Sequence, residues 1–433
     1  MNELAQKLND DLIKLNSNVY HLLSNLGKKL YYPKGILSQS TEASKKATRF
    51  NATIGIATEN NVPMHFEHIQ DTLQGYSPEN VYPYAPPCGI FELRLEWKRK
   101  LLRDNPSLQD KNIGIPITTN ALTHGLSLAA DLFVDENDVI ILPDKYWGNY
   151  QTIFQVRRGG HLKTFKLFDE FEKFNVRAFR ECLMQQVDAG KAIVLLNFPN
   201  NPTGYTPDED EAQGIISVIL EAAEAGINIA VILDDAYFGL FYEGSVKESL
   251  FGRLAGLHPK ILPIKVDGAT KENYVWGLRV GFLTFAAESL ELLEILEQKT
   301  KGLIRGTISS SSHLSQTIIL QSLQSSQFEI EKRQKYEVLK HRAKKVKKII
   351  RHEKYKEVWS FYPFNSGYFM CLKLLKVDAE NLRLHLLDEY GLGTIAINST
   401  DLRIAFSCVE EKDLEELFEL IYRGNNDLLT EGV

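Results

Sequence analysis

Short apolar runs alternate with helical stretches along the first two thirds of the chain, and this alternation limits the possible folds. Several runs are apolar on both faces, as strands are when helices cover both sides of a sheet. Helical patterns such as Ala178–Val187 and Glu209–Ala225 separate most of the runs. The alternation predicts an α/β fold with a doubly wound sheet. The predicted strands are Ile115–Thr118, Val139–Leu142, Leu162–Leu167, Ala192–Asn197, Ile229–Leu233, Ile261–Val266 and Val280–Phe285.

The pattern changes after about residue 289. Glu291–Lys301 and Ile318–Ile349 are helical in pattern, and the second of them predicts a long connecting helix. Strand-like runs follow at Ser360–Leu374 and Leu402–Ser407, and Lys412–Tyr422 predicts a closing helix. The C-terminal part of the chain therefore predicts a second, smaller domain.

The composition argues against several classes of partner. A net charge of −6 gives no reason to expect nucleic acid or an anionic membrane, and we interpret the basic run Lys340–Arg351 as a solvated helix face. The four cysteines are scattered without metal-ligand spacing, so reduced thiols and no metal site are expected. Residues 1–16 lack an apolar signal core, and no apolar run is long enough to span a bilayer. We expect a cytoplasmic protein.

Three polar motifs stand where predicted strands end. Asn200-Asn201-Pro202-Thr203-Gly204 follows one strand, and Asp234-Asp235-Ala236-Tyr237 follows the next. Lys271 comes after a third strand, and Arg279 lies eight residues beyond it. Because the carboxyl ends of parallel strands form the ligand crevice of such a sheet, we expect these side chains to converge on one site.

These residue types suit pyridoxal phosphate (PLP), which needs a lysine for its aldehyde, an acid for its ring nitrogen and an arginine for its phosphate. Lys271 would form the Schiff base and then move the proton of the substrate α-carbon. Lys265 is a competitor, but it lies inside an apolar strand. Asp234 or Asp235 would pair with the ring nitrogen, since strand alternation turns only one of the two inward.

With the three motifs in this order, residues 52–421 resemble the class I/II PLP-dependent aminotransferases, of the aspartate aminotransferase-like fold (fold type I). The resemblance implies a large domain with a seven-stranded, mostly parallel sheet that has one antiparallel strand. It also implies a smaller α/β domain made of the N- and C-terminal parts. The corresponding divisions are 1–56 for the N-terminal segment that joins the small domain, 57–300 for the PLP-binding domain, and 301–433 for the small domain with its connecting helix.

The resemblance also implies the role of each residue around the ring. The spacing of the second motif selects Asp234 for the ring nitrogen, while Tyr237 and Asn201 would hydrogen-bond the phenolic oxygen of the ring. Trp147, in a Trp-Gly-Asn run, would stack on the ring face. Lys271, Asp234 and Tyr237 are therefore the expected catalytic residues.

The phosphate is expected at the helix that opens after the first strand, because a helix N-terminus favours anions. Thr270 and Arg279 would complete this site. The chain departs from the family near Ala121, where glycine or serine is usual, and at Gly268, where aspartate aminotransferases carry a phosphate-binding serine. The expected cofactor-binding residues are Ala121, Leu122, Thr123, Trp147, Asn201, Asp234, Tyr237, Thr270, Lys271, Arg279 and Tyr84.

Substrate contacts follow from the same resemblance. Arg403 would grip the α-carboxylate through two hydrogen bonds, with Gly55 and Asn201 beside it. Arg305 falls where aspartate aminotransferases bind the side-chain carboxylate of a substrate across the dimer interface. A structural ion pair is the alternative for this residue.

A tyrosine at the place of Tyr84 reaches the phosphate of the other subunit in the family, which implies a homodimer with shared active sites. Tyr82, two residues earlier in the chain, is the alternative tyrosine for this role.

The resemblance implies transfer of an amino group from an L-amino acid to a 2-oxo acid by a ping-pong mechanism, with 2-oxoglutarate as the expected acceptor. A PLP-dependent β-lyase or decarboxylase of the same fold is the alternative, since fold and cofactor do not fix the reaction. A non-catalytic PLP-sensing regulatory domain is a third possibility. The lack of an evident helix-turn-helix module argues against it.

Overall fold

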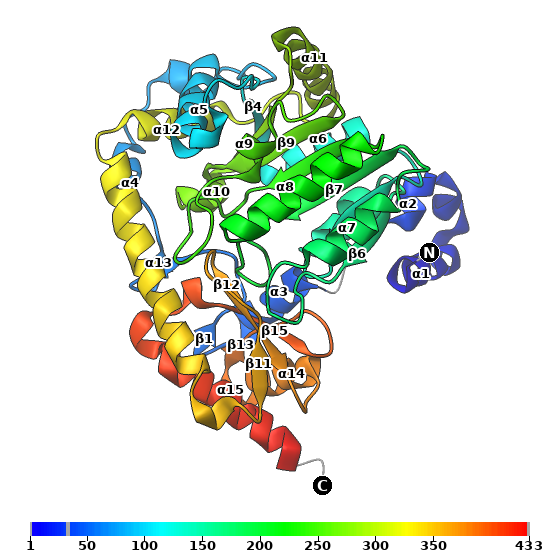
Figure 1. Ribbon diagram of the computed structural model, residues 1–433. Coiled ribbons are helices and arrows are strands. Elements are labelled where there is room, and N and C mark those ends of the chain that lie inside the picture. Colours follow the sequence, from blue (N-terminus) through cyan, green and yellow to red (C-terminus); the bar gives the residue numbers. More distant parts are fainter. Residues whose placement is uncertain (1, 32–34, 431–433) are drawn as a thin grey trace.

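A large seven-stranded sheet forms the centre of the computed structural model, which describes residues 2–31 and 35–430 (Figure 1). All seven predicted runs form its strands, and the predicted fold class is confirmed. Strand β10 is antiparallel to both of its neighbours, while the other pairs are parallel. The order across the sheet is β4 (Ile117–Asn120), β10 (Val280–Phe285), β9 (Ile261–Gly268), β8 (Asn228–Asp234), β7 (Lys191–Asn197), β5 (Val139–Pro143) and β6 (His161–Phe165).

Helices cover both faces of this sheet, as the doubly apolar strands require. In β7, Ile193 and Leu195 pack into one buried cluster, and the alternate residues Val194 and Leu196 pack into another. The first cluster includes α6 (Ala121–Phe133) and the second includes α7 (Val176–Met184) and α8 (Glu209–Glu224). The strands are therefore buried on both sides, and polar groups at their ends are the ones free to form a site. Helices α5 (Phe91–Asp104), α9 (Leu250–Leu254) and α10 (Ala269–Glu272) complete this part of the fold.

A second, four-stranded antiparallel sheet lies in the C-terminal part. The predicted strand Ser360–Leu374 is wrong as one element: it is two strands, because Pro363 has no N–H for a ladder and Gly367 turns with a φ of 70°. The sheet order is β11 (Trp359–Phe361), β12 (Phe369–Leu374), β15 (Asp401–Ala405) and β14 (Ile395–Ala396). Helix α14 (Ala379–Tyr390) packs against β14 and β15, and α15 (Leu414–Thr430) packs against α14.

Part of the N-terminal region packs against this second sheet. Strand β1 (Phe50–Asn51) pairs with β13 (Leu392–Gly393), and α3 (Ile36–Lys46) is hydrogen-bonded to β14 through Gln39 and Ala396. A short hairpin, β2 (Thr58–Glu59) and β3 (Val62–Pro63), and helix α4 (Glu67–Thr72) follow.

The connecting helical region is interrupted. The predicted helix Ile318–Ile349 is wrong as one element, since α12 (His313–Gln324) ends before α13 (Phe328–Ile350) begins. The hydroxyl of Ser325 accepts a hydrogen bond from the N–H of Gln327, which gives the backbone an alternative to the helix. Helix α13 then runs from the large sheet toward the small one, while α11 (Leu290–Thr307) lies beside the large sheet (Figure 1). In the basic run on α13, Val346, Ile349 and Ile350 are buried as expected.

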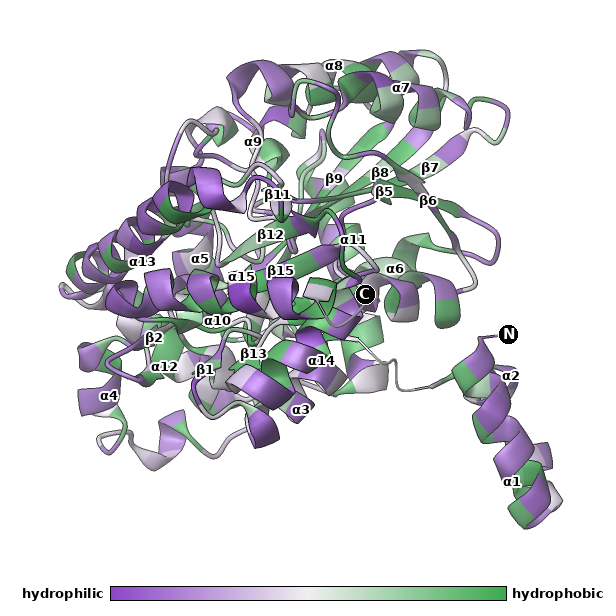
Figure 2. Cartoon of the chain, turned by 90° about the horizontal axis from the view of Figure 1, so that it is seen from below, coloured by the Kyte–Doolittle hydropathy of each residue, from purple (hydrophilic) through white to green (hydrophobic). Residues whose placement is uncertain are grey.

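Helices α1 (Glu3–Leu22) and α2 (Asn25–Lys29) lie apart from the rest of the molecule (Figure 2). They pack against each other, and apolar side chains such as Leu15 and Leu22 are exposed. Across residues 2–31 and 35–430, no helix combines the length and apolar character needed to cross a bilayer.

Candidate active site

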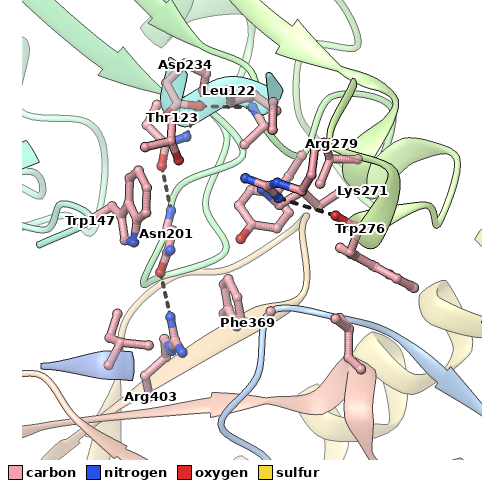
Figure 3. Close-up of a pocket in the computed structure, with 18 residues that line it drawn as sticks. Leu122, Thr123, Trp147, Asn201, Asp234, Lys271, Trp276, Arg279, Phe369 and Arg403 are labelled. Atoms are coloured by element: carbon pink, nitrogen blue, oxygen red, sulfur yellow. Dashed lines mark hydrogen bonds between the residues drawn. The ribbon is translucent and has the colours of Figure 1, made fainter. Parts of the chain in front are cut away.

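A cavity of about 270 Å³ opens at the edge of the large sheet where β7, β8 and β9 end, and it extends to β15 of the small sheet (Figure 3). Every residue expected in the site lines this cavity, except Tyr84 and Arg305. The lining residues are Ile36, Gly55, Ile56, Ala121, Leu122, Thr123, Trp147, Asn197, Asn201, Asp234, Ala236, Tyr237, Thr270, Lys271, Trp276, Arg279, Phe369 and Arg403.

Asp234, the last residue of β8, presents a buried carboxylate to the cavity. Its Oδ2 accepts a hydrogen bond of 2.6 Å from the hydroxyl of Tyr150, and its Oδ1 accepts one of 3.1 Å from the N–H of Ala236. Burial raises the pKa of Asp234, and these hydrogen bonds and the charge of Lys271 oppose that rise. The sequence interpretation missed Tyr150. Its place directly after the Trp-Gly-Asn run of Trp147 is the signal that could have identified it.

Asp235 turns to the opposite side of the sheet, as strand alternation requires. It accepts a hydrogen bond of 2.6 Å from Ser249 and forms an ion pair with Lys265, whose side chain is fully buried. Nζ of Lys265 also lies 3.5 Å from Oδ2 of Asp267. Oδ1 of Asp267 accepts a hydrogen bond of 3.1 Å from the indole N–H of Trp97. Burial raises the pKa of Asp267 to about 6. Both rivals, Asp235 and Lys265, therefore lie behind the cavity wall and pair with each other.

Lys271 lies in α10, directly after β9, and its amine faces the cavity. Burial lowers the pKa of Lys271 to about 8, with the charge of Asp234 opposing this and that of Arg279 adding to it. Nζ lies 5.3 Å from the centre of the Tyr237 ring. The backbone carbonyl of Lys271 accepts a hydrogen bond of 2.9 Å from Tyr368, which holds the short helix in place. A lysine with this pKa is partly neutral, and therefore nucleophilic, near pH 8.

The N-terminus of α6 and Arg279 form a cradle for an anion. Ala121 adopts a left-handed backbone with a φ of 61°, and its N–H donates a 3.0 Å hydrogen bond to the carbonyl of Arg279. A backbone of this kind favours glycine, and alanine adopts it at a cost of about 1–2 kcal/mol. Leu122 and Thr123, in the first turn of α6, line the cavity, and the N–H groups of a first helical turn have no partner within the helix.

The second departure from the family also has a structural reason. A Cβ atom added at Gly268 would lie 2.7 Å from the Cα of Gly281 and 2.7 Å from the carbonyl oxygen of Val280. A serine therefore does not fit at Gly268 without displacement of β10. Thr270, two residues later, lines the cavity and carries a hydroxyl.

Arg403, in β15, is a buried guanidinium without an anionic partner. Nη1 donates a 3.0 Å hydrogen bond to Oδ1 of Asn201, and Nη2 donates one of 2.7 Å to the carbonyl of Thr53. Nε is buried without a hydrogen bond, and no carboxylate of the described residues lies within 4 Å of the group. Burial lowers the pKa of Arg403 to about 10. Its guanidinium carbon lies 4.2 Å from the centre of the Phe369 ring. A buried guanidinium of this kind favours an anionic ligand.

A chain of hydrogen bonds joins the two ends of the cavity (Figure 3). The side chain of Asn197 donates to the carbonyl of Asp234 at 2.7 Å and accepts from the N–H of Asn201 at 2.8 Å. Asn201 in turn accepts from Arg403. Asn197 was not expected in the site. Nor were the apolar lining residues Ile36, Ile56, Trp276 and Phe369, because no polar group marks them in the sequence.

Tyr84 and Arg305 lie outside the cavity lining of the single chain. The side chain of Tyr84 is 95% exposed, and that of Tyr82 is 81% exposed. Arg305 is exposed on α11 and donates a hydrogen bond to Ser309. Within the described part of the chain no carboxylate lies within 4 Å of it, so the structural ion pair considered as an alternative is not formed. The roles of both residues across an interface stay predictions.

The fold is similar to that of solved aminotransferases. An aminotransferase of Anaerococcus prevotii has a TM-score of 0.84 at 23% identity, with 94% of this chain and 99% of that chain covered. A kynurenine aminotransferase of Pyrococcus horikoshii, solved in complex with PMP, has a TM-score of 0.79 at 16% identity, with 96% of this chain and 99% of that chain covered. These likenesses show the fold.

The family itself follows from sequence. The model of the aminotransferase class I and II family matches residues 65–421, and the chain belongs to this PLP-dependent family. Curated relatives include an aspartate aminotransferase of Bacillus subtilis, 25% identical over 53% of this chain and 54% of the relative. A probable aspartate aminotransferase of Methanocaldococcus jannaschii is 23% identical over 54% of this chain and 57% of the relative. The chain therefore matches about half the length of these relatives.

Proposed function

We propose that this chain is a PLP-dependent aminotransferase that transfers the amino group of an L-amino acid to a 2-oxo acid. The observation that carries the proposal is one cavity with a lysine of lowered pKa, Lys271, between a buried acid, Asp234, and an unpaired buried guanidinium, Arg403. These groups suit a cofactor aldehyde, a ring nitrogen and a substrate carboxylate, respectively.

The residues present fit the cofactor. Asp234, held by Tyr150, is the partner for the ring nitrogen, and Trp147 offers its indole to the ring face. Tyr237 and Asn201 are the hydrogen-bonding groups for the phenolic oxygen. Arg279, Thr270 and the N-terminus of α6 suit the phosphate. When bound, PLP supplies an electron sink for the pair of electrons released at the substrate α-carbon.

The protein groups have separate tasks in the proposed reaction. Arg403 donates hydrogen bonds to the α-carboxylate and so fixes the orientation of the amino acid. Nζ of Lys271 would hold the aldehyde of the cofactor, and as a free amine it would take the proton from the α-carbon of the substrate. The negative charge of Asp234 keeps the ring nitrogen protonated. Gly55 borders the substrate, where a Cβ would lie 3.4 Å from Phe369 and 3.5 Å from the hydroxyl of Tyr237.

The finer assignments belong to the same proposal. 2-Oxoglutarate is the proposed amino acceptor. A homodimer with shared sites is proposed because Tyr84, though expected at a phosphate, is exposed and away from the cavity of its own chain. A cytoplasmic location is the expectation from sequence.

A donor screen tests the proposal. The purified protein with PLP is incubated with 2-oxoglutarate and each of the common L-amino acids, and glutamate formation is measured together with ammonia and CO2. Transfer gives glutamate and the 2-oxo acid of the donor in equal amounts, and Lys271→Ala should abolish it. Release of ammonia or CO2 without glutamate would instead support the β-lyase or decarboxylase alternative. Absence of any turnover with bound PLP would support the regulatory alternative.

A further inference from the structure

A buried ion pair joins the segment of the cofactor-facing Trp147 to the strand of Arg403. Nζ of Lys145, two residues before Trp147, lies 2.8 Å from Oδ2 of Asp401, two residues before Arg403. The side chain of Asp401 is 1% exposed and that of Lys145 is 14% exposed. The large sheet supplies the lysine, in the loop after β5, and the small sheet supplies the acid, in β15.

The surroundings hold Asp401 in its charged form. Its carboxylate also accepts hydrogen bonds of 3.0 Å from the hydroxyl of Tyr362, 2.9 Å from the side chain of Asn398 and 3.0 Å from Thr400. Burial works against the charge, but Lys145 and these donors keep the pKa of Asp401 below its usual value. Asp401 in turn raises the pKa of Lys145 above that of an ordinary lysine, despite the burial of the amine.

Asp401 and Arg403 share one face of β15, since side chains two residues apart in a strand point the same way. Arg403 has no carboxylate partner of its own among the described residues. Without Lys145, the buried carboxylate of Asp401 would leave an uncompensated negative charge on the face of β15 that carries this guanidinium, and this charge would disfavour the incoming carboxylate of a substrate. The ion pair with Lys145 neutralises that charge.

The lysine is also fixed from its other side. The backbone carbonyl of Lys145 accepts a 3.0 Å hydrogen bond from the side chain of Asn200, next to Asn201 in the first motif. Its Nζ lies 4.9 Å from the centre of the Tyr362 ring. Lys145 is therefore set between the loop that carries Asn201 and the strand that carries Arg403.

We propose that Lys145 is a positioning residue that acts through Arg403: it holds Asp401 in a buried ion pair and so leaves the guanidinium for the carboxylate of the substrate. The proposal rests on the proposed function for the identity of the substrate. It concerns carboxylate affinity and not the bond to the cofactor.

The test measures binding of 3-phenylpropanoate, a carboxylate without an amino group, to the holoprotein by calorimetry, together with KM and kcat for amino donors. Lys145→Met leaves Asp401 unpaired and should raise both the dissociation constant and KM about tenfold. Lys145→Arg keeps the charge and should restore most of the affinity. The double variant Lys145→Met with Asp401→Asn removes both charges and should bind more tightly than Lys145→Met alone.

A matched control comes from the ion pair of Lys191 and Asp138, 2.6 Å apart where β7 and β5 begin, at the edge of the sheet opposite the cavity. Lys191→Met should change the melting temperature without changing the carboxylate affinity. If Lys145→Met lowers stability but binds 3-phenylpropanoate as the parent does, the inference is wrong. It is equally wrong if the double variant binds no better than the single one, because loss of packing would then explain both.

The carboxylate measurement also separates this inference from the proposed function. If the parent protein binds 3-phenylpropanoate, and the variants follow the expected order, but no amino transfer occurs, the proposed function fails and the positioning role stands. If the parent protein does not bind the carboxylate at all, the role of Arg403 fails and this inference fails with it.

Discussion

The hydroxyl of Tyr150 donates a 2.6 Å hydrogen bond to Oδ2 of Asp234, and both side chains are buried. This contact links a residue of the segment after β5 to the last residue of β8. A hydrogen bond to a carboxylate favours its charged form, while burial disfavours it. Tyr150 therefore helps Asp234 to remain ionised where a protonated ring nitrogen needs a negative partner.

Replacement of Tyr150 by phenylalanine removes this donor and should raise the pKa of Asp234. A hydrogen bond to a charged group contributes about 1.5–3 kcal/mol, so kcat should fall roughly tenfold to a hundredfold. The measurement is kcat across neutral pH. Tyr146→Phe is the control, since the hydroxyl of Tyr146 only accepts a 2.9 Å hydrogen bond from Gln151 at an exposed position. Equal kcat values for the two variants would contradict the role of Tyr150.

The amine of Lys271 should capture the cofactor in the pH range set by its lowered pKa. As the pH rises through about 8, Nζ of Lys271 loses its proton and becomes nucleophilic. The rate at which the cofactor-free protein binds added PLP, followed by absorbance, should therefore rise with a midpoint near pH 8. Borohydride reduction and peptide mapping should place the cofactor on Lys271. A label on the buried Lys265, or a midpoint near the ordinary lysine pKa, would show that the assignment is wrong.

Complementation tests the shared site. If Tyr84 acts on the phosphate of the other subunit, then Lys271→Ala and Tyr84→Phe protomers should each be weak as homodimers. Their mixture should regain activity, because mixed dimers contain one site with both native residues. The two variants are denatured and refolded together, and the transaminase activity of the mixture is then measured. A protein that sediments as a monomer at the assay concentration would contradict this arrangement.

Arg403 and Arg305 should separate two recognition tasks. Arg403→Ala should lower kcat/KM for every amino donor by roughly tenfold to a hundredfold or more, since all donors carry the α-carboxylate. Arg305→Ala should weaken aspartate and glutamate and leave alanine and tyrosine almost unchanged, because only a second carboxylate requires it. The ratio of kcat/KM for glutamate over alanine in each variant decides between these roles. An equal loss for all donors in Arg305→Ala would indicate a structural role.

Asp267 should make stability depend on pH in a predictable direction. Its pKa of about 6 in the folded protein lies above the usual value of 3.8, so the folded state holds this proton more tightly than the unfolded state. The contribution of Asp267 to the free energy of unfolding is therefore greatest below about pH 4, and it decreases as the pH rises through 6. Asp267→Asn should be more stable than the parent above pH 6, by on the order of 1–3 kcal/mol, and the difference should vanish near pH 4.

Urea unfolding of both proteins from pH 4 to pH 8, in the same PLP-saturated buffer, measures this difference. The asparagine can still accept the hydrogen bond from Trp97, so packing should be retained. A difference that does not change with pH would mean that Asp267 does not titrate in this range.

Local patterns in the sequence predict the sheet and the polar part of the cavity. The seven apolar runs coincide with strands because burial on both faces leaves a clear mark, and the motifs meet because each follows or precedes such a strand. Alternation alone indicates that only one of Asp234 and Asp235 turns inward, and the motif spacing of the resembled family was needed to select Asp234. The break before α13 was missed because it depends on the hydroxyl of a single serine, Ser325.

Contacts between distant segments could not be predicted in this way. Tyr150 meets Asp234 across 84 positions of sequence, and Lys145 meets Asp401 across 256. A lone tyrosine, or a lone lysine in a loop, has no local pattern that names its partner. The apolar walls of the cavity were missed for the same reason, since Ile36 and Phe369 resemble any other core residues in the sequence.

The reversed direction of β10 has a consequence for how the site can change. Because β9 and β10 are antiparallel, the end of one and the start of the other lie at the same edge, and a short connection joins them. Lys271 and Arg279 both belong to that connection. An insertion or deletion between Gly268 and Val280 would therefore displace the amine, the guanidinium or both. Asp234 ends β8, and Asn201 and Trp147 follow β7 and β5, so changes in the β9–β10 connection leave the residues at these other strand ends in place.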